Sequence, residues 1–121
     1  MEGLRRVPLI AAKMAEDEKM NACVRLNRND GVRTFGIRAT AEPYRQQVEE
    51  ALQEAGSVTI DFGGYEATQS FVDQLIGSLM LRHGREVLSK LVFENCSPEV
   101  KGIIRFVVKD RAGQLASSAA A

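Results

Sequence analysis

The stretch that most constrains the fold is residues 57–82, SVTIDFGGYEATQSFVDQLIGSLMLR. Its first six residues alternate apolar and polar side chains and are rich in β-branched residues, which is typical of a short buried strand. Gly63 and Gly64 end this strand, because paired glycines relieve the steric limits on φ and favour a turn. From Phe71 to Met80, apolar residues recur at helical spacing. The stretch therefore predicts the first half of a βαβ unit. Its loop lies at the carboxyl end of the strand, where open α/β sheets present their functional groups.

Ser70 is expected to begin that helix as its cap. Asp73 follows three residues later, at the spacing of a capping box, and a serine cap contributes about 1 kcal/mol. A phosphoryl group on the same hydroxyl is compatible with capping, because a dianion at a helix N-terminus meets the positive end of the helix dipole. Ser70 is therefore interpreted either as a cap alone or as a cap that is also phosphorylated.

The preceding segments predict two strands and a helix. Residues 23–26 and 32–37 alternate on either side of a turn signal at 29–31, which indicates a β-hairpin. A helix follows, opened by Thr40 and ended by Gly56. Its expected apolar and polar faces are, respectively, Tyr44, Val48, Ala51, Leu52 and Ala55, and Arg45, Gln46, Glu49, Glu50 and Gln53.

Beyond the central stretch, residues 91–93 indicate a third core strand. The run 97–99, Ser-Pro-Glu, is typical of a helix start and disfavours the alternative, a last strand over residues 103–108. The element order is thus β-β-α-β-α-β-α, an α/β arrangement with a mixed sheet packed against helices. The residues expected to be buried together are Phe62, Leu75, Leu79 and Phe93.

The length of 121 residues suits one domain, placed at residues 22–110. Residues 1–21 are expected to form a flexible N-terminal arm and residues 111–121 a disordered C-terminal tail. Sixteen basic and sixteen acidic residues cancel, which argues against binding to nucleic acid or to an anionic membrane. No run approaches the ~20 apolar residues of a membrane span, and the apolar run at 7–12 is too short for a secretory signal. A cytoplasmic location is therefore expected.

Several polar residues have both a chemical and a structural interpretation. Cys23 and Cys96 lack ligand spacing, so reduced thiols without a metal or cofactor are expected. Asp61 ends a strand where Mg²⁺ could bind, but no second carboxylate is suitably spaced, and bracing of the loop is favoured. Arg38 could bind a phosphate, although pairing with a carboxylate is favoured. Asn95 is expected to close a turn rather than to bind a ligand, and a further polar residue, His83, to end a helix.

The motif DFGG-x₅-SFVDQLIGSL, with Arg38 before it and FENCSPEV after it, resembles the bacterial STAS-like domains, which are related to the anti-sigma factor antagonists. The resemblance covers about residues 22–110. It rests most on a pattern that follows the strand ending in Asp-Phe and consists of Ser70, Phe71, Asp73 and Gly77.

In the antagonists, the corresponding helix start carries Asp-Ser-Ser-Gly, and a partner kinase phosphorylates its first serine. Ser70 corresponds to that serine by its spacing from Asp61, whereas Gln69, Phe71 and Val72 replace the other three residues. The resemblance implies a non-catalytic regulatory module that binds a protein partner with a histidine-kinase-like ATPase fold. The implied docking residues are Thr68, Gln69, Phe71, Asp73 and Asn95.

The competing class is a small ligand- or nucleotide-binding protein, or an enzyme, that uses the loop after strand 57–62. Its candidate residues are Asp61, Thr68, Ser70 and Asn95. The sequence offers no base–nucleophile pair, metal cluster or phosphate loop to support catalysis, so a binding module is the favoured interpretation.

Overall fold

The computed structural model of the chain describes residues 21–120, with side chains described up to residue 116. The predicted N-terminal arm lies outside these residues, apart from Asn21, which begins the first strand. Within residues 21–120, none of the helices combines the length and the apolar character that a membrane span requires.

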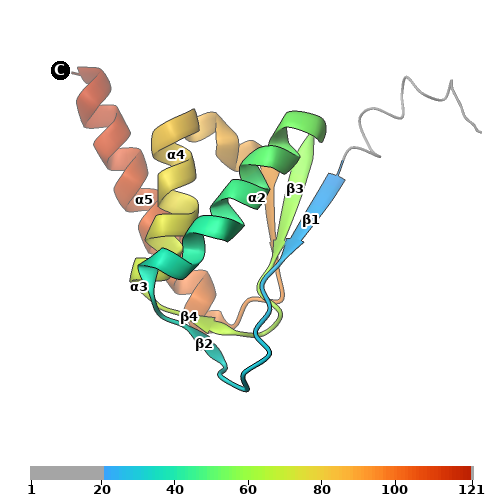
Figure 1. Ribbon diagram of the computed structural model, residues 1–121. Helices are drawn as coiled ribbons and strands as arrows, with labels where there is room; N and C mark the ends of the chain where they lie inside the picture. The colour runs from blue at the N-terminus through green and yellow to red at the C-terminus, as the bar shows by residue number, and fades with distance from the viewer. Residues whose placement is uncertain (1–20, 121) are drawn as a thin grey trace, which may run out of the picture.

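A three-stranded parallel sheet forms the frame of the fold (Figure 1). The central strand is β3 (Ser57–Asp61), as the sequence predicts, and it lies between β1 (Asn21–Arg25) and β5 (Leu91–Glu94). Two short strands, β2 (Thr34–Phe35) and β4 (Glu66–Ala67), pair with each other, also in parallel.

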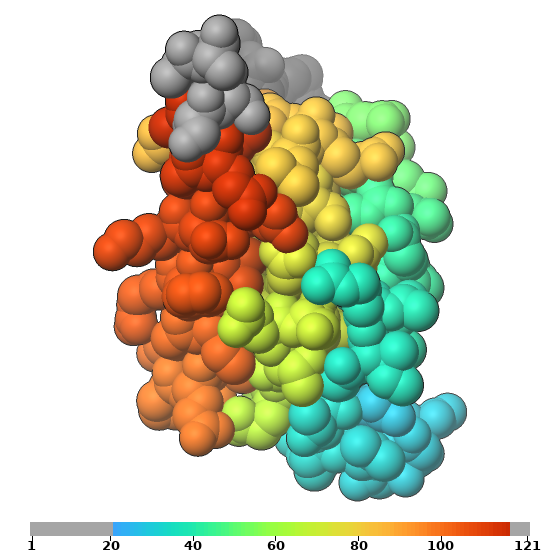
Figure 2. Space-filling model, turned by 90° about the vertical axis from the view of Figure 1, so that its left-hand side faces the viewer, coloured from blue at the N-terminus to red at the C-terminus, as the bar shows by residue number. Residues whose placement is uncertain are grey.

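The helices lie on one side of the three-stranded sheet (Figure 1). They are α2 (Ala41–Glu54), α3 (Gln69–Val72), the π-helical turn η3 (Asp73–Gly77), α4 (Ser78–His83) and α5 (Pro98–Ala120), with the 3₁₀ turns η2 (Arg38–Thr40) and η4 (Arg85–Lys90). α3, η3 and α4 follow one another without a break. This central helix lies between α5 on one side and η2 with α2 on the other (Figure 2).

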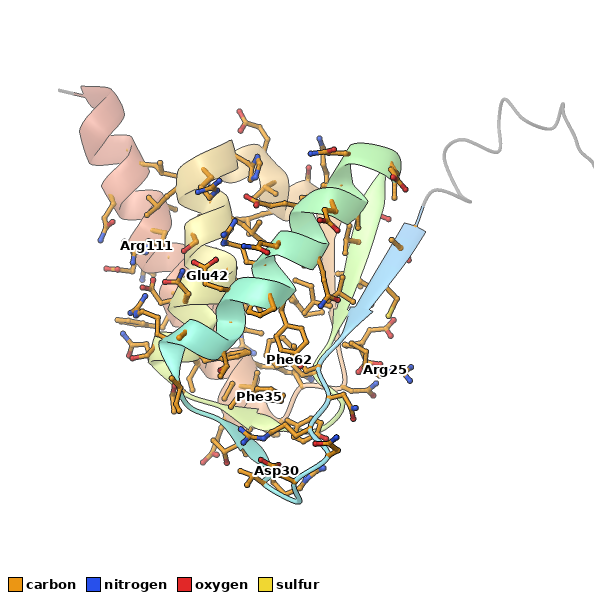
Figure 3. The ribbon with its side chains drawn as sticks, in the orientation of Figure 1. Arg25, Asp30, Phe35, Glu42, Phe62 and Arg111 are labelled. Carbon is orange, nitrogen blue, oxygen red and sulfur yellow. The ribbon has the colours of Figure 1, made fainter. Side chains whose placement is uncertain are left out.

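The core lies between the sheet and these helices. Phe62, Leu75 and Leu79 are completely buried, as predicted, whereas Phe93 is only partly buried and packs against them from β5. Phe35 and Phe62 point into the space between the helices and the strands (Figure 3). The α/β class and the helical state of residues 103–108 are confirmed, and the predicted order of elements is found with one additional strand, β4.

The predicted hairpin is wrong, and every strand pair among the described residues is parallel rather than mixed. Residues 21–25 pair with β3, and α2 provides the crossover between the two parallel strands. The turn that suggested a hairpin is closed locally by Asp30, whose carboxylate accepts hydrogen bonds from Arg28 and from the Val32 amide. After that turn the chain forms β2, which pairs with β4 and not with β1.

Two further expectations need correction. Residues 111–120 continue α5 instead of forming a disordered tail, because alanine favours helix and Arg111 and Leu115 pack against the rest of the domain. Arg45, expected on the polar face of α2, is buried. Its guanidinium is held by Glu42 and Glu49 on the same helix, which compensates its charge.

Candidate functional site

The first turn of α3 is capped by Thr68 and not by Ser70. The Thr68 hydroxyl accepts a hydrogen bond from the Phe71 amide at 3.2 Å and donates one to the Gly36 carbonyl at 3.1 Å. Thr68 has the extended backbone of a cap, with φ −84° and ψ 165°. The capping interpretation of Ser70 is therefore wrong: a neighbouring hydroxyl fills that position because it can also bond to the loop before η2.

Ser70 is the second residue of α3, and its side chain is exposed. Its hydroxyl forms no hydrogen bond with any residue in the described part of the chain. Gln69, beside it, is also exposed. Phe71 is completely buried and contacts Phe35 in the core, so it does not offer a side chain to a partner as the sequence analysis expected.

Asp73, one turn after Ser70, joins three elements of the fold. Arg111 of α5 donates two hydrogen bonds to its carboxylate, at 2.7 and 2.6 Å. Arg38 of η2 donates a third at 3.1 Å and also donates to the Gln74 side chain. The expectation that Arg38 pairs with a carboxylate is confirmed. Figure 3 labels Arg111 on the part of α5 that runs beside α4.

Two guanidinium groups, those of Arg38 and Arg111, face the carboxylate of Asp73. Burial raises the pKa of Asp73, but the hydrogen bonds from Arg111 and Arg38 outweigh burial and lower the pKa below its ordinary value. Asp73 also raises the pKa of Arg111. Asp73 is therefore ionised between the two guanidinium groups, and the carboxylate of Asp110 adds a second negative charge near Arg111.

Gly77 leaves room for this ion pair. A Cβ atom at this position would lie 2.6 Å from an Asp73 carboxylate oxygen and 3.0 Å from Arg111 Nε. Ser70, Asp73 and Gly77 belong to the pattern that carried the family resemblance. Of these three residues, Asp73 and Gly77 have a structural role in the ion pair with Arg111. An acidic residue and a glycine four positions later form the pocket that receives an arginine from α5.

A second cluster lies where the three parallel strands end. The buried Asp61 carboxylate accepts hydrogen bonds from the Gly63 amide, the Asn95 side chain and Arg25 Nε, at 2.8, 2.8 and 3.2 Å. The hydrogen bonds from Asn95 and Gly63 lower the pKa of Asp61. Asn95 has φ +56°, and its carbonyl accepts from the Gly64 amide. The predicted bracing role of Asp61 and the turn-closing role of Asn95 are confirmed.

An open hollow of about 530 Å³ lies over this second cluster and is lined by Arg25, Asp61, Gly63, Gly64, Asn95, Cys96 and Ser97. The structure thus brings together two of the four residues proposed for a ligand site, Asp61 and Asn95. The other two, Thr68 and Ser70, do not line the hollow. Figure 3 shows Arg25 pointing away from the helices at this end of the sheet.

A second hollow, of about 560 Å³, lies beside the start of α3. Its lining comes from β4, α3 and α5 and consists of Glu66, Ala67, Gln69, Glu99, Gly102, Ile103 and Phe106. The Phe106 side chain is 54% exposed, although large apolar groups are usually covered. Ile103 and Phe106 make one part of this hollow apolar, whereas Glu66 and Glu99 make another part acidic.

His83, Cys23 and Cys96 are the other polar residues that the sequence analysis considered. His83 ends α4, as expected, and its Nε2 lies 2.8 Å from the Glu49 carboxylate. Cys23 and Cys96 are free, and burial raises the pKa of the Cys96 thiol. Among the residues from 21 to 120, no three His, Cys, Asp or Glu side chains come together as a candidate metal site.

Sequence analysis missed the role of Arg111, because it placed residues 111–121 in a tail. A signal was present. Val100, Ile104 and Val107 recur at helical spacing, and Arg111 continues the same face of α5 one turn further.

One family model matches the chain over residues 40–101, and its description is a STAS-like domain of unknown function (DUF4325). The match covers half of the chain and includes Ser70, Asp73 and Gly77, whereas Arg38 and Arg111 lie outside it. No curated protein and no solved structure matches the chain.

Proposed function

The chain belongs to the family of STAS-like domains of unknown function, and on this basis we propose that it is a cytoplasmic, non-catalytic bacterial regulatory module that binds another protein. The proposed partner has a histidine-kinase-like ATPase fold, as the resemblance to the anti-sigma factor antagonists implies. The partner transfers the γ-phosphoryl group of ATP to Ser70 Oγ, which loses its proton, and ADP is released. Phosphorylation of Ser70 then switches the interaction.

The observation that carries this proposal is that the Ser70 hydroxyl forms no hydrogen bond with any residue that the structure describes. Because Thr68 caps α3, the fold does not need the Ser70 hydroxyl for helix stability. The side chain is exposed, within reach of a kinase, on the first turn of a helix, where a dianion is electrostatically favoured. A serine with no structural task at this position is suited to reversible modification.

The proposed docking face surrounds Ser70 at the start of α3. Thr68 and Gln69 are exposed there, and the adjacent hollow presents Phe106 to an apolar group of the partner. Exposed aromatic side chains next to polar ones are typical of interaction surfaces. A phosphate on Ser70 adds about two negative charges to this face, and a partner that docks there must either compensate or desolvate them.

The ligand-binding or enzymatic alternative is less well supported by the geometry. The Asp61 carboxylate already accepts three hydrogen bonds from the protein, which leaves it poorly placed as a base or a metal ligand. We therefore expect no turnover of nucleotides, esters or phosphoesters by the isolated protein. A steady hydrolytic rate that disappears in Asp61→Ala, with the fold intact, would overturn this part of the proposal.

The experiment that tests the switch begins with protein isolated from its native host. Intact-mass analysis with peptide mapping should find a single phosphoryl group on Ser70, and the Ser70→Ala variant should lack it. Ser89→Ala is the matched control, since Ser89 is also exposed but bonds to the Glu86 carbonyl, and it should retain the modification.

The second arm measures binding of the copurified ATPase partner by calorimetry. Ser70→Asp should weaken binding at least tenfold, whereas Ser70→Ala should bind like wild type. If no phosphorylated species is found and Ser70→Asp binds as tightly as wild type, Ser70 is not a switch.

A further inference from the structure

The segment that leads into η2 runs alongside the start of α3 and contacts it on both sides of Ser70 in the sequence. The Gly36 carbonyl accepts a hydrogen bond from the Thr68 hydroxyl, two residues before Ser70. Arg38, two residues after Gly36, reaches Asp73, three residues after Ser70. Residues three apart on a helix share a face, so Ser70 and Asp73 lie on the same face, beside the Arg38 side chain.

The two arginines that hold Asp73 differ in how fully they are engaged. Arg111 donates from Nε and Nη2 to Asp73 and from Nη1 to Gln114, and its side chain is 21% exposed. Arg38 donates only from Nη1, and its side chain is 50% exposed. Within the described residues, the other donors of Arg38 have no partner. Asp73 therefore stays paired when Arg38 leaves, because Arg111 alone binds it through two hydrogen bonds.

We infer that Arg38 is the binding residue for a phosphoryl group on Ser70, and that phosphorylation moves its guanidinium from Asp73 and Gln74 to the phosphate. This inference rests on the proposed function, since it presumes that Ser70 is the residue modified. A guanidinium binds a phosphate through two parallel hydrogen bonds, and the phosphate carries more charge than a carboxylate. The movement needed is about one helical turn or less, roughly 5 Å, which lies within the range of an arginine side chain.

The charged side chains around Ser70 determine the side of the helix to which a phosphate on this residue turns. Glu66 and Glu99 line the hollow next to Gln69 and repel a phosphate, whereas Arg38, which comes from η2, attracts it. The phosphate is therefore drawn toward η2. Release of Gln74 and Asp73 by Arg38 removes hydrogen bonds that tie η2 to the central helix, so that the modification also alters the surface around the docking face.

The test uses the full chain with phosphoserine installed at position 70 during translation, so that no kinase or partner is needed. The pKa of the phosphate is measured by ³¹P NMR titration. It should lie below the value of about 6 for a free phosphoserine, and Arg38→Gln should raise it by about half a pH unit, the scale of an exposed ion pair. Arg38→Lys, which keeps the charge without the bidentate geometry, should give an intermediate value.

The matched control is Arg85→Gln, which removes the same charge from an exposed position just after α4, at the opposite end of the central helix. It should leave the phosphate pKa unchanged. If Arg38→Gln and Arg85→Gln give the same phosphate pKa as the parent protein, the inference is wrong. This outcome differs from failure of the proposed function, which would appear as unmodified Ser70 in the native host or as partner binding that ignores Ser70→Asp.

Discussion

Replacement of Gly77 by alanine tests the ion pair between Asp73 and Arg111. In an ordinary helix this change stabilises, because glycine costs about 1 kcal/mol relative to alanine. At Gly77 the new methyl group would lie 2.6 Å from the Asp73 carboxylate and 3.0 Å from Arg111 Nε. Since real Cβ contacts are longer, the carboxylate must move away from the guanidinium.

The expected magnitude follows from the bonds at risk. Each hydrogen bond to a charged group contributes about 1.5–3 kcal/mol, and the side chains of Asp73 and Arg111 are only 14% and 21% exposed. Loss of one of their two hydrogen bonds outweighs the gain of about 1 kcal/mol in helix propensity. We therefore expect Gly77→Ala to lower the free energy of unfolding by about 0.5–2 kcal/mol.

The assay is urea unfolding followed by far-ultraviolet circular dichroism. Gly102→Ala is the control, because its Cβ would meet nothing within 4 Å on α5, and it should raise the free energy of unfolding by up to about 1 kcal/mol. In an Asp73→Ala background, the cost of Gly77→Ala should shrink, because no carboxylate remains to be displaced. A Gly77→Ala variant as stable as wild type would refute the reasoning.

Three further predictions concern the core, the cap and the response to acid. Leu79→Ala should lower the free energy of unfolding by about 2–5 kcal/mol, whereas the exposed Leu81→Ala should cost less than about 0.5 kcal/mol; equal losses would show that the helix faces are misassigned. Thr68→Ala should cost about 1 kcal/mol and Ser70→Ala less than about 0.5 kcal/mol in the same urea assay, and the reverse order would return the cap to Ser70. The pKa of Asp61 is lowered in the folded state, so its stabilising contribution is present above the ordinary value of 3.8 and is lost as the pH falls through the folded-state pKa. Unfolding measured between about pH 5 and pH 2 should therefore depend less steeply on pH in Asp61→Asn than in wild type, and equal slopes would contradict the assignment.

Sequence determined the parts of this protein that depend on near neighbours. The strand at 57–61, the glycine turn and the helical stripe from Phe71 onward follow from alternation, backbone freedom and periodicity within short windows. The bracing of the loop by Asp61 and the turn at Asn95 were predicted in the same way, because residue type and position at a strand end limit what these side chains can do.

Only the tertiary structure decided which segments meet. The strand at 21–25 carries an alternating pattern that suits either a hairpin or a parallel strand, and its pairing with β3 depends on the α2 crossover. Thr68 caps α3 in place of Ser70 because its hydroxyl also donates to Gly36, 32 residues away. Asp73 binds Arg111 across 38 residues, in a space that Gly77 leaves open. The free energy of such contacts arises between segments that no local window contains, so the meeting of Arg38 and Arg111 at Asp73, one turn after Ser70, is visible only once the helices are packed.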